Sequence, residues 1–116
     1  MSISPLDALR HILDEVEYLL AHKDEVDQSA FLEDETRQRA FVRSLEIIGE
    51  ATKRVPEDFR TKYPEVPWKQ MAGMRDRITH AHVGVDHDIV WEVLTNHIPP
   101  VERQIERIVA EQDEFE

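Results

Sequence analysis

The sequence contains no cysteine, which excludes disulfide bonds, thiolate metal ligands and a thiol nucleophile. Long hydrophobic runs are also absent: the longest apolar stretches span only a few residues, far fewer than the roughly 20 that a membrane-spanning helix needs. The first ten residues, MSISPLDALR, have neither a basic head nor an apolar segment, so we expect no signal peptide. These absences predict a soluble, cytoplasmic protein.

The chain length indicates one domain. With 116 residues, we expect residues 1–116 to fold as a single unit around one core. A domain of this size buries roughly two-thirds of the surface that its unfolded chain exposes.

Basic residues are scarce overall but gather in the middle of the chain. The formal net charge is −11, yet residues 37–80 hold 10 Lys or Arg against 6 Asp or Glu. Basic domains are the usual partners of nucleic acids, so this middle third permits a polyanionic ligand. A solvated helix face that happens to be rich in arginine explains the asymmetry equally well.

The first half of the chain carries the apolar period of amphipathic helices. We expect a first helix over residues 5–23 and a second that ends near Val55. Asp34 or Thr36 is the candidate N-cap of the second helix, and the segment SAFLED, residues 29–34, is a candidate for a separate helical turn. The apolar residues that define the first helix are Leu9, Leu13, Val16 and Leu20.

Prolines mark the next two expected helices. Pro56 is placed to open a short helix over residues 56–63. Pro67 in turn precedes a third main helix, which we expect to run from about Trp68 toward His80 and to end at Gly84.

A fourth helix is expected to begin near Asp86, a natural N-cap, and to continue to about Ile108. Pro99 and Pro100 must kink or break it. We expect residues 110–116 to form a frayed acidic tail. No segment has the period-two pattern of a strand, so the predicted fold is an all-α, antiparallel, up-and-down four-helix bundle with short extra helices.

The segment RDRITHAHVGVD, residues 75–86, holds the residues with the clearest chemical meaning. Arg75 and Arg77 are permanent cations, while His80 and His82 can exchange protons near neutral pH, a set that suits phosphate chemistry. In a continuous helix, however, His80 lies roughly 140° away from Arg75. The two converge only if the helix loosens before Gly84, or if a second copy faces the first across a two-fold interface.

His80 also has plainer interpretations. As a histidine near a helix C-terminus, it would interact with the helix dipole or with a backbone carbonyl. A metal site would need His80, His82 and His87 together, but helical geometry does not put all three on one side, and no metalloprotease-like carboxylate pattern accompanies them.

Two further residues have alternative roles that the sequence leaves open. Gly73, in mid-helix, permits close approach either of a second copy's backbone or of a segment within the monomer. Glu50 is placed either to pair with Arg54, four residues on, or to orient an active-site arginine.

Several motifs together resemble the HepT-like ribonuclease toxins of the HEPN superfamily. They are IGEA at residues 48–51, PW at 67–68, GMRD at 73–76, and GVD at 84–86 followed by Trp91. The resemblance extends over about residues 31–101. It implies a helical bundle that forms a homodimer and cuts RNA rather than DNA at a cleft between two copies of the motif, without a metal or other cofactor and away from membranes.

The resemblance also implies the site residues. The family motif is Arg, four residues, His, one residue, Tyr, and Arg75 and His80 occupy its first two positions. His80 is then the general base or acid, Arg75 stabilises phosphoryl charge, and Asp76 orients one of them. For RNA contacts we expect the cations Arg77, Arg43 and Lys69.

His82 stands where the family has a tyrosine to which its antitoxin, the minimal nucleotidyltransferase MntA, attaches AMP. An imidazole has no phenolic oxygen, so we expect no AMPylation site here, and His82 is instead a candidate for a second proton-transfer group. The resemblance implies a metal-independent endoribonuclease toxin of a type VII-like pair with an MntA-like partner. The alternative is a catalytically silent module that binds nucleotide, RNA or chiefly that partner.

Overall fold

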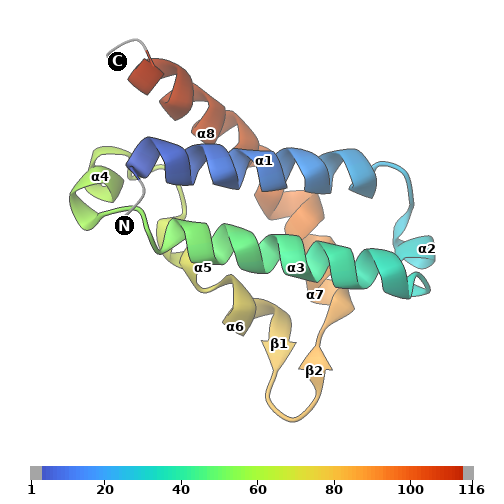
Figure 1. Ribbon diagram of the computed structural model, residues 1–116. Coiled ribbons are helices and arrows are strands. Elements are labelled where there is room, and N and C mark those ends of the chain that lie inside the picture. The colour runs from blue at the N-terminus through green and yellow to red at the C-terminus, as the bar shows by residue number, and fades with distance from the viewer. Residues whose placement is uncertain (1–3, 114–116) are drawn as a thin grey trace.

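The structure is a computed structural model, and it describes residues 4–113. Helices dominate it, which confirms the predicted all-α fold (Figure 1). No helix among the described residues is both long and apolar enough to cross a membrane. In chain order the elements are α1 (Pro5–Lys23), α2 (Gln28–Leu32), α3 (Glu35–Thr52), α4 (Glu57–Lys62), α5 (Trp68–Ala72), α6 (Met74–Ile78), β1 (Thr79–His80), β2 (Gly84–Val85), α7 (His87–Glu92), the π-helical turn η1 (Val93–His97) and α8 (Ile98–Asp113).

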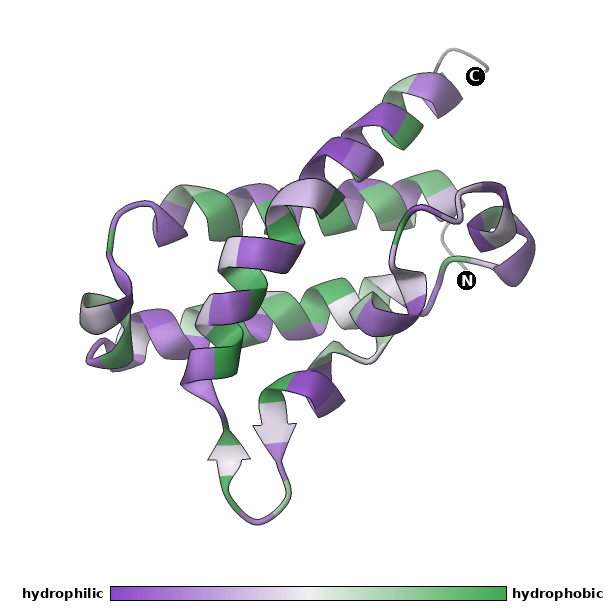
Figure 2. Ribbon diagram, turned by 180° about the vertical axis from the view of Figure 1, so that it is seen from behind, coloured by the Kyte–Doolittle hydropathy of each residue, from purple (hydrophilic) through white to green (hydrophobic). Residues whose placement is uncertain are grey.

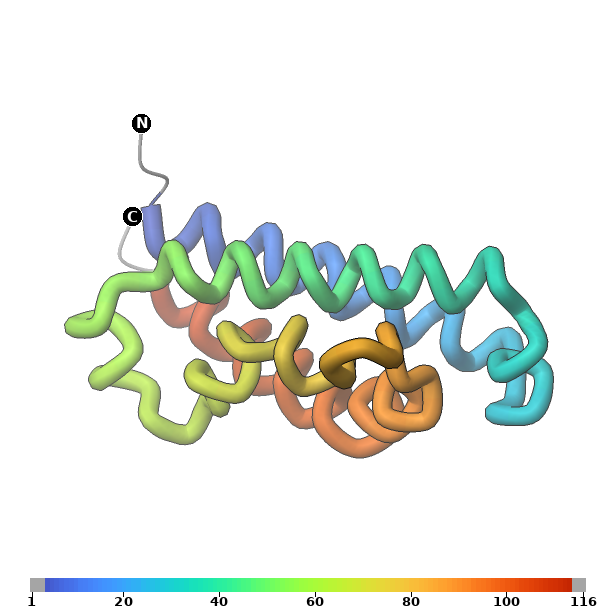
Figure 3. The backbone as a smooth tube through the Cα atoms, turned by 90° about the horizontal axis from the view of Figure 1, so that it is seen from below, coloured from blue at the N-terminus to red at the C-terminus, as the bar shows by residue number. Residues whose placement is uncertain are grey.

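Side-chain caps fix where the first three helices begin. The Ser4 hydroxyl accepts a hydrogen bond from the amide of Asp7 at 3.1 Å and starts α1. Asp34, and not Thr36, caps α3, with Oδ1 accepting from the amide of Arg37 at 3.0 Å. Asp27 caps α2, which confirms a separate helical turn before α3. The helices α1 and α3 then lie side by side and antiparallel (Figures 1 and 3).

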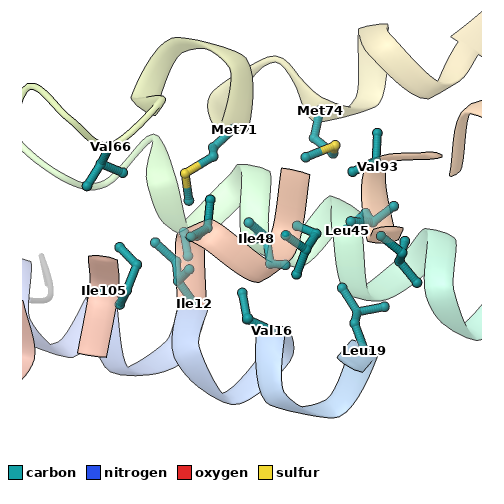
Figure 4. Packing of buried hydrophobic residues seen from close by; sticks show 14 of the residues in the cluster. Ile12, Val16, Leu19, Leu45, Ile48, Val66, Met71, Met74, Val93 and Ile105 are labelled. Carbon is teal, nitrogen blue, oxygen red and sulfur yellow. The ribbon is translucent and has the colours of Figure 1, made fainter. Parts of the chain in front are cut away.

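The core forms where α1, α3 and α8 meet the short helices of the middle segment. Figure 4 shows side chains from α1 and α3 pointing toward those of α5, α6 and α8. Along each long helix, apolar and polar residues recur with the period of an amphipathic helix, as the sequence predicts (Figure 2). Fully buried members include Leu9, Ile12, Leu19, Phe31, Phe41, Leu45, Ile48, Ile78, Leu94, Ile105 and Ile108.

Gly49 is the glycine that permits close packing within the protomer. A Cβ atom added to it would lie 3.1 Å from the carbonyl oxygen of Met71, so the backbones of α3 and α5 meet there. At Gly73 an added Cβ would meet only the carbonyls of the preceding turn, the nearest being that of Lys69 at 3.4 Å. Gly73 lies between α5 and α6, and an added Cβ there would meet no segment distant in sequence.

The expected continuous helix from Trp68 to His80, ending at Gly84, is wrong. The chain forms α5 and α6 instead, leaves helical geometry at Thr79 with an extended backbone (φ −115°, ψ 148°), and enters a hairpin. Thr79 pairs with Val85 and His80 pairs with Gly84, so the prediction that no strand forms is also wrong. β-branched residues such as Thr79 and Val85 favour this extended conformation, and a ladder this short has too few residues to show a period of two.

A tight turn closes the hairpin at residues 80–83. The amide of Val83 donates to the carbonyl of His80 at 3.1 Å. His82 has a positive φ of 70° and Gly84 one of 100°. Gly84 thus supplies a left-handed conformation to a hairpin rather than to a helix end. The hairpin projects away from the helices (Figure 1), and Val83 in its turn is 81% exposed.

The last helical segment begins at Asp86, as predicted, and passes Pro99 and Pro100 without a break. The two prolines lack amide donors, and the π-helical turn η1 accommodates this loss just before them. In that turn the amide of Ile98 donates to the carbonyl of Val93, five residues back. Residues 110–113 of the predicted frayed tail belong to α8, and residues 114–116 lie outside the described part of the chain.

Candidate active site

Arg75 projects from α6 toward α3. Met74 and Ile78 of the same helix are buried in the core, which turns Arg75 outward at its flank. Its guanidinium Nη1 lies 3.6 Å from a carboxylate oxygen of Glu46 on α3. The Arg75 side chain is 79% exposed while that of Glu46 is 24% exposed, so a half-buried anion holds an accessible cation.

Arg77 projects from the other flank of α6, toward η1. Its Nη2 lies 3.2 Å from Nε2 of His97, which must be the acceptor because a guanidinium only donates. Both side chains border a small cavity of about 150 Å³ with mostly apolar walls. The walls come from Pro67, Gln70, Met71, Met74, Val93, Ile98 and Val101.

His80 is the last residue of β1, and its side chain reaches across to Asp86, which directly follows β2. Its Nε2 lies 3.2 Å from Oδ2 of Asp86. The other oxygen of Asp86 accepts the amides of Asp88 and Ile89 at 3.0 and 3.2 Å and so caps α7. The hydrogen bond from the Ile89 amide, followed by that from His80, holds the pKa of Asp86 below its ordinary value. The His80 side chain remains 54% exposed.

His82 occupies the turn with its side chain exposed. Its positive φ is a conformation that histidine, asparagine and aspartate adopt more readily than other side chains do. Within residues 4–113 its imidazole makes no hydrogen bond or ion pair, so the ring is open to solvent on the same hairpin as His80.

The other predicted site residues lie on separate elements. Asp76 is exposed on α6 and has no hydrogen bond or ion pair in the described chain, so its orienting role stays a prediction. Lys69 is exposed on α5 and borders an open groove beside α4. Arg43, on α3, lies 3.7 Å from Glu50. Among the described residues Glu50 therefore pairs with Arg43, and with neither Arg54 nor Arg75.

The histidines of the described chain do not gather into a metal-binding cluster. No group of three His, Asp or Glu side chains within residues 4–113 is arranged to hold a metal ion. The ring of His87 instead packs edge-on against Phe31, with centroids 6.2 Å apart.

Two carboxylates of the site escaped the sequence analysis. No role for Glu46 was evident from the sequence, which indicated Asp86 as a helix cap and as the end of the GVD motif but not as a partner of His80. Their contacts with Arg75 and His80 depend on how α3 and α7 pack against the middle segment, which no local spacing encodes. The structure thus leaves the predicted arginine and histidine exposed on α6 and β1, each paired with a carboxylate from another element.

The all-α bundle, with this arginine and histidine on either side of a helix-to-hairpin junction, fits a HEPN-type domain. Comparison with known proteins agrees: the family described as Ribonuclease HepT-like matches residues 9–108. The chain belongs to this HepT-like family. Membership supports a ribonuclease function of the HEPN type.

Named relatives cover almost the whole chain. A protein of Caldanaerobacter subterraneus subsp. tengcongensis, "Putative RNase TTE0752", is 44% identical over 109 residues, which are 94% of this chain and 97% of the relative. "Probable ribonuclease HepT" of Thermococcus cleftensis is 39% identical over 108 residues, 93% of this chain and 98% of the relative. "Putative RNase MJ0127" of Methanocaldococcus jannaschii is 40% identical over 103 residues, 89% of this chain and 85% of the relative. No solved structure matches the chain.

Proposed function

We propose that this protein is a metal-independent endoribonuclease toxin that cleaves RNA by transesterification. The observation that carries the proposal is the placement of Arg75 and His80, both accessible to solvent and each paired with a carboxylate from another element. Family membership and the names of the relatives support the same substrate class.

The reaction begins with attack of a ribose 2′-oxygen on the adjacent phosphorus. As the new O2′–P bond forms and the P–O5′ bond breaks, a base takes the 2′-hydroxyl proton and an acid protonates the departing 5′-oxygen. The products are a 2′,3′-cyclic phosphate and a free 5′-hydroxyl. DNA lacks the attacking group, which restricts the substrate to RNA.

Three side chains supply the groups that this reaction requires. His80 is the general base or acid, a role typically worth 10²- to 10⁴-fold in rate. His82 is the second imidazole, exposed on the same hairpin, and is available for the other proton transfer. Arg75 donates hydrogen bonds to the phosphoryl oxygens, where negative charge grows in the transition state.

The active centre forms between two copies of the chain. Arg75 is tied to α3 by Glu46, whereas His80 is tied to the start of α7 by Asp86. These contacts hold the two side chains on different elements and leave both exposed for a second hairpin to approach. In the homodimer, Arg75 of one copy and His80 of the other reach the same scissile phosphate.

Mixing two inactive variants tests this arrangement. Arg75→Ala and His80→Ala should each lose cleavage, and a mixture refolded together should regain part of it. The heterodimer contains one composite centre with both groups intact. A mixture as inactive as its components, despite heterodimers detected by native mass spectrometry, would contradict a centre shared between copies.

RNA contacts beyond the centre come from Arg77, Arg43 and Lys69. They lie on α6, α3 and α5, in the basic middle third of the chain. Binding of single-stranded RNA should weaken with salt by about 0.7 log units per log unit of salt for each phosphate contact. The variants Arg77→Ala, Arg43→Ala and Lys69→Ala should each lower that slope, and a slope unchanged in all three would remove them from the interface.

The physiological partner in this proposal is an MntA-like nucleotidyltransferase antitoxin in a type VII-like pair. Residue 82 offers no phenol to receive AMP, and the tyrosines of the chain lie elsewhere: Tyr18 is on α1, and the Tyr63 hydroxyl accepts a hydrogen bond from Gln112 at 2.7 Å. Incubation with such an enzyme and ATP should therefore leave residue 82 unmodified in mass spectrometry. Inhibition would then come from binding alone.

The second candidate function is a silent module that binds RNA or the nucleotidyltransferase without cutting. His82, in place of the family tyrosine, is the observation that favours it. Incubation of the pure protein with RNA in the presence of a chelator separates the two: the nuclease yields cyclic-phosphate ends, whereas the module yields a complex and intact RNA. Loss of cleavage in His80→Ala, with helical content unchanged by circular dichroism, would exclude a contaminating nuclease.

A further inference from the structure

We propose that Asp86 is the positioning residue of His80: it fixes the imidazole as the Nε2–H tautomer and makes Nδ1 the nitrogen that exchanges protons with RNA. This inference rests on the ribonuclease function proposed above. The inference depends on the two contacts of the Asp86 carboxylate. Its Oδ2 lies within hydrogen-bond distance of His80, and its Oδ1 accepts hydrogen bonds from the first amides of α7.

Backbone hydrogen bonds at Asp86 and at the residue before it fix the position of Asp86. Its own amide donates to the carbonyl of Ile78 at 2.8 Å, which joins the beginning of α7 to the end of α6. Immediately before it, Val85 pairs with Thr79 in the hairpin ladder. Backbone hydrogen bonds therefore hold His80, beside the turn, and Asp86, at the base of the same hairpin, independently of their side-chain contact.

The contact of the Asp86 Oδ2 atom with Nε2 decides which ring nitrogen of His80 carries the proton. An ionised carboxylate only accepts hydrogen bonds, so a neutral His80 in contact with Oδ2 carries its proton on Nε2. Nδ1 then has a free lone pair that can take the 2′-hydroxyl proton. The imidazolium formed by that transfer is stabilised by the adjacent carboxylate, as in the known Asp–His pairs of hydrolases.

Asp86→Asn is the decisive substitution because it preserves the cap while reversing the hydrogen bond. Asparagine caps helices about as well as aspartate does, so its Oδ1 should keep the amides of Asp88 and Ile89. Its amide group then faces His80 and donates to Nε2. The neutral imidazole is forced to carry its proton on Nδ1, which removes the proposed base.

Two measurements on the full-length protein test the inference. Ring-nitrogen chemical shifts of ¹⁵N-labelled histidine, with His80 assigned by comparison with His80→Gln, should show the Nε2–H form in the wild type and the Nδ1–H form in Asp86→Asn. Single-turnover RNA cleavage should fall by about 10²- to 10⁴-fold in Asp86→Asn. Circular dichroism and thermal unfolding should remain close to the wild type.

Asp88→Asn is the matched control, since Asp88 is exposed in the same first turn of α7 and makes no side-chain contact with His80 in the described chain. It should keep both the tautomer and the rate. An unchanged His80 tautomer in Asp86→Asn would overturn the inference, as would full cleavage by that variant. If the wild-type protein does not cleave RNA, while Asp86→Asn still changes the His80 tautomer, the proposed function would be overturned. The Asp86–His80 contact would then be supported.

Discussion

The carboxylate of Glu46 on α3 lies 3.6 Å from the guanidinium of Arg75 on α6, and it is the less exposed member of the pair. An arginine this accessible would otherwise sample many rotamers. Glu46 restrains it from outside its own helix, so the direction in which Arg75 points is set by the packing of α6 on α3.

Replacing Glu46 with alanine should therefore lower RNA cleavage by about tenfold, because the guanidinium loses its preferred direction and not its charge. Stability should change by less than about 1 kcal/mol, because the Arg75 side chain is 79% exposed and water screens its charge. Single-turnover kinetics and urea unfolding measure the two effects. Glu35→Ala, which removes the 2.6 Å pair with Arg39 on the same helix, is the control and should cleave normally, because neither residue is assigned to the centre or to RNA binding.

Gly49→Val should destabilise the fold by about 1–3 kcal/mol. The new side chain would press against the Met71 carbonyl, which lies 3.1 Å from the position of an added Cβ and belongs to the backbone, so it cannot move aside as a side chain can. Urea unfolding measures the loss. Gly73→Ala, whose Cβ would find ordinary contact distances, should be nearly neutral, and equal losses in the two variants would refute this packing account.

Glu102→Gln should stabilise the protein at neutral pH. Burial, followed by the charges of Glu106 and of Glu17 on α1, raises the pKa of Glu102 above its ordinary value of 4.5. The folded state thus binds this proton more tightly than the unfolded state does, and the stability that the proton provides is lost as the pH rises.

Urea unfolding at two pH values checks this sign. The advantage of Glu102→Gln should be present at pH 7 and should disappear near pH 4, where the wild-type carboxyl is largely protonated in both states. Glu111→Gln, an exposed substitution on the same helix, is the control for the loss of one carboxylate from α8. A Glu102→Gln variant that is less stable than the wild type at pH 7 would contradict the sign.

Substitutions of His82 can separate its backbone role from its chemical one. Asparagine tolerates the positive φ of 70° but has no imidazole, so His82→Asn should fold normally and cleave RNA about 10- to 100-fold more slowly. His82→Val should also destabilise the hairpin, because β-branched residues resist that conformation. Amide hydrogen exchange at Val83 reports the turn. Full activity in His82→Asn would remove His82 from the mechanism.

Most of the helical frame was predictable because it depends on local signals. The apolar period defined α1 and α3, Asp86 marked the start of α7, and the prolines placed α4 and α5. The segment after Ile78 was not predictable in this way. Its two-residue strands exist because each pairs with the other across a turn, and the sequence of either strand alone contains no such information.

The same distinction between local signals and tertiary packing applies to the candidate site. Arg75 and His80 were recognised from their residue types, their spacing and the family motif. The partners that restrain them, Glu46 and Asp86, come from α3 and from the start of α7, so they emerge only when these elements pack together. The interruption of the helix at Ile78 also places His80 on the hairpin, and the angle computed for a continuous helix therefore does not apply.

The most direct test is a cleavage assay with single-stranded RNA in excess chelator, comparing the wild type with His80→Ala after both have been shown by circular dichroism to be equally helical. We predict 2′,3′-cyclic phosphate ends from the wild type and a rate at least about 10²-fold lower from His80→Ala. Equal cleavage by the two proteins would contradict an active centre built on His80.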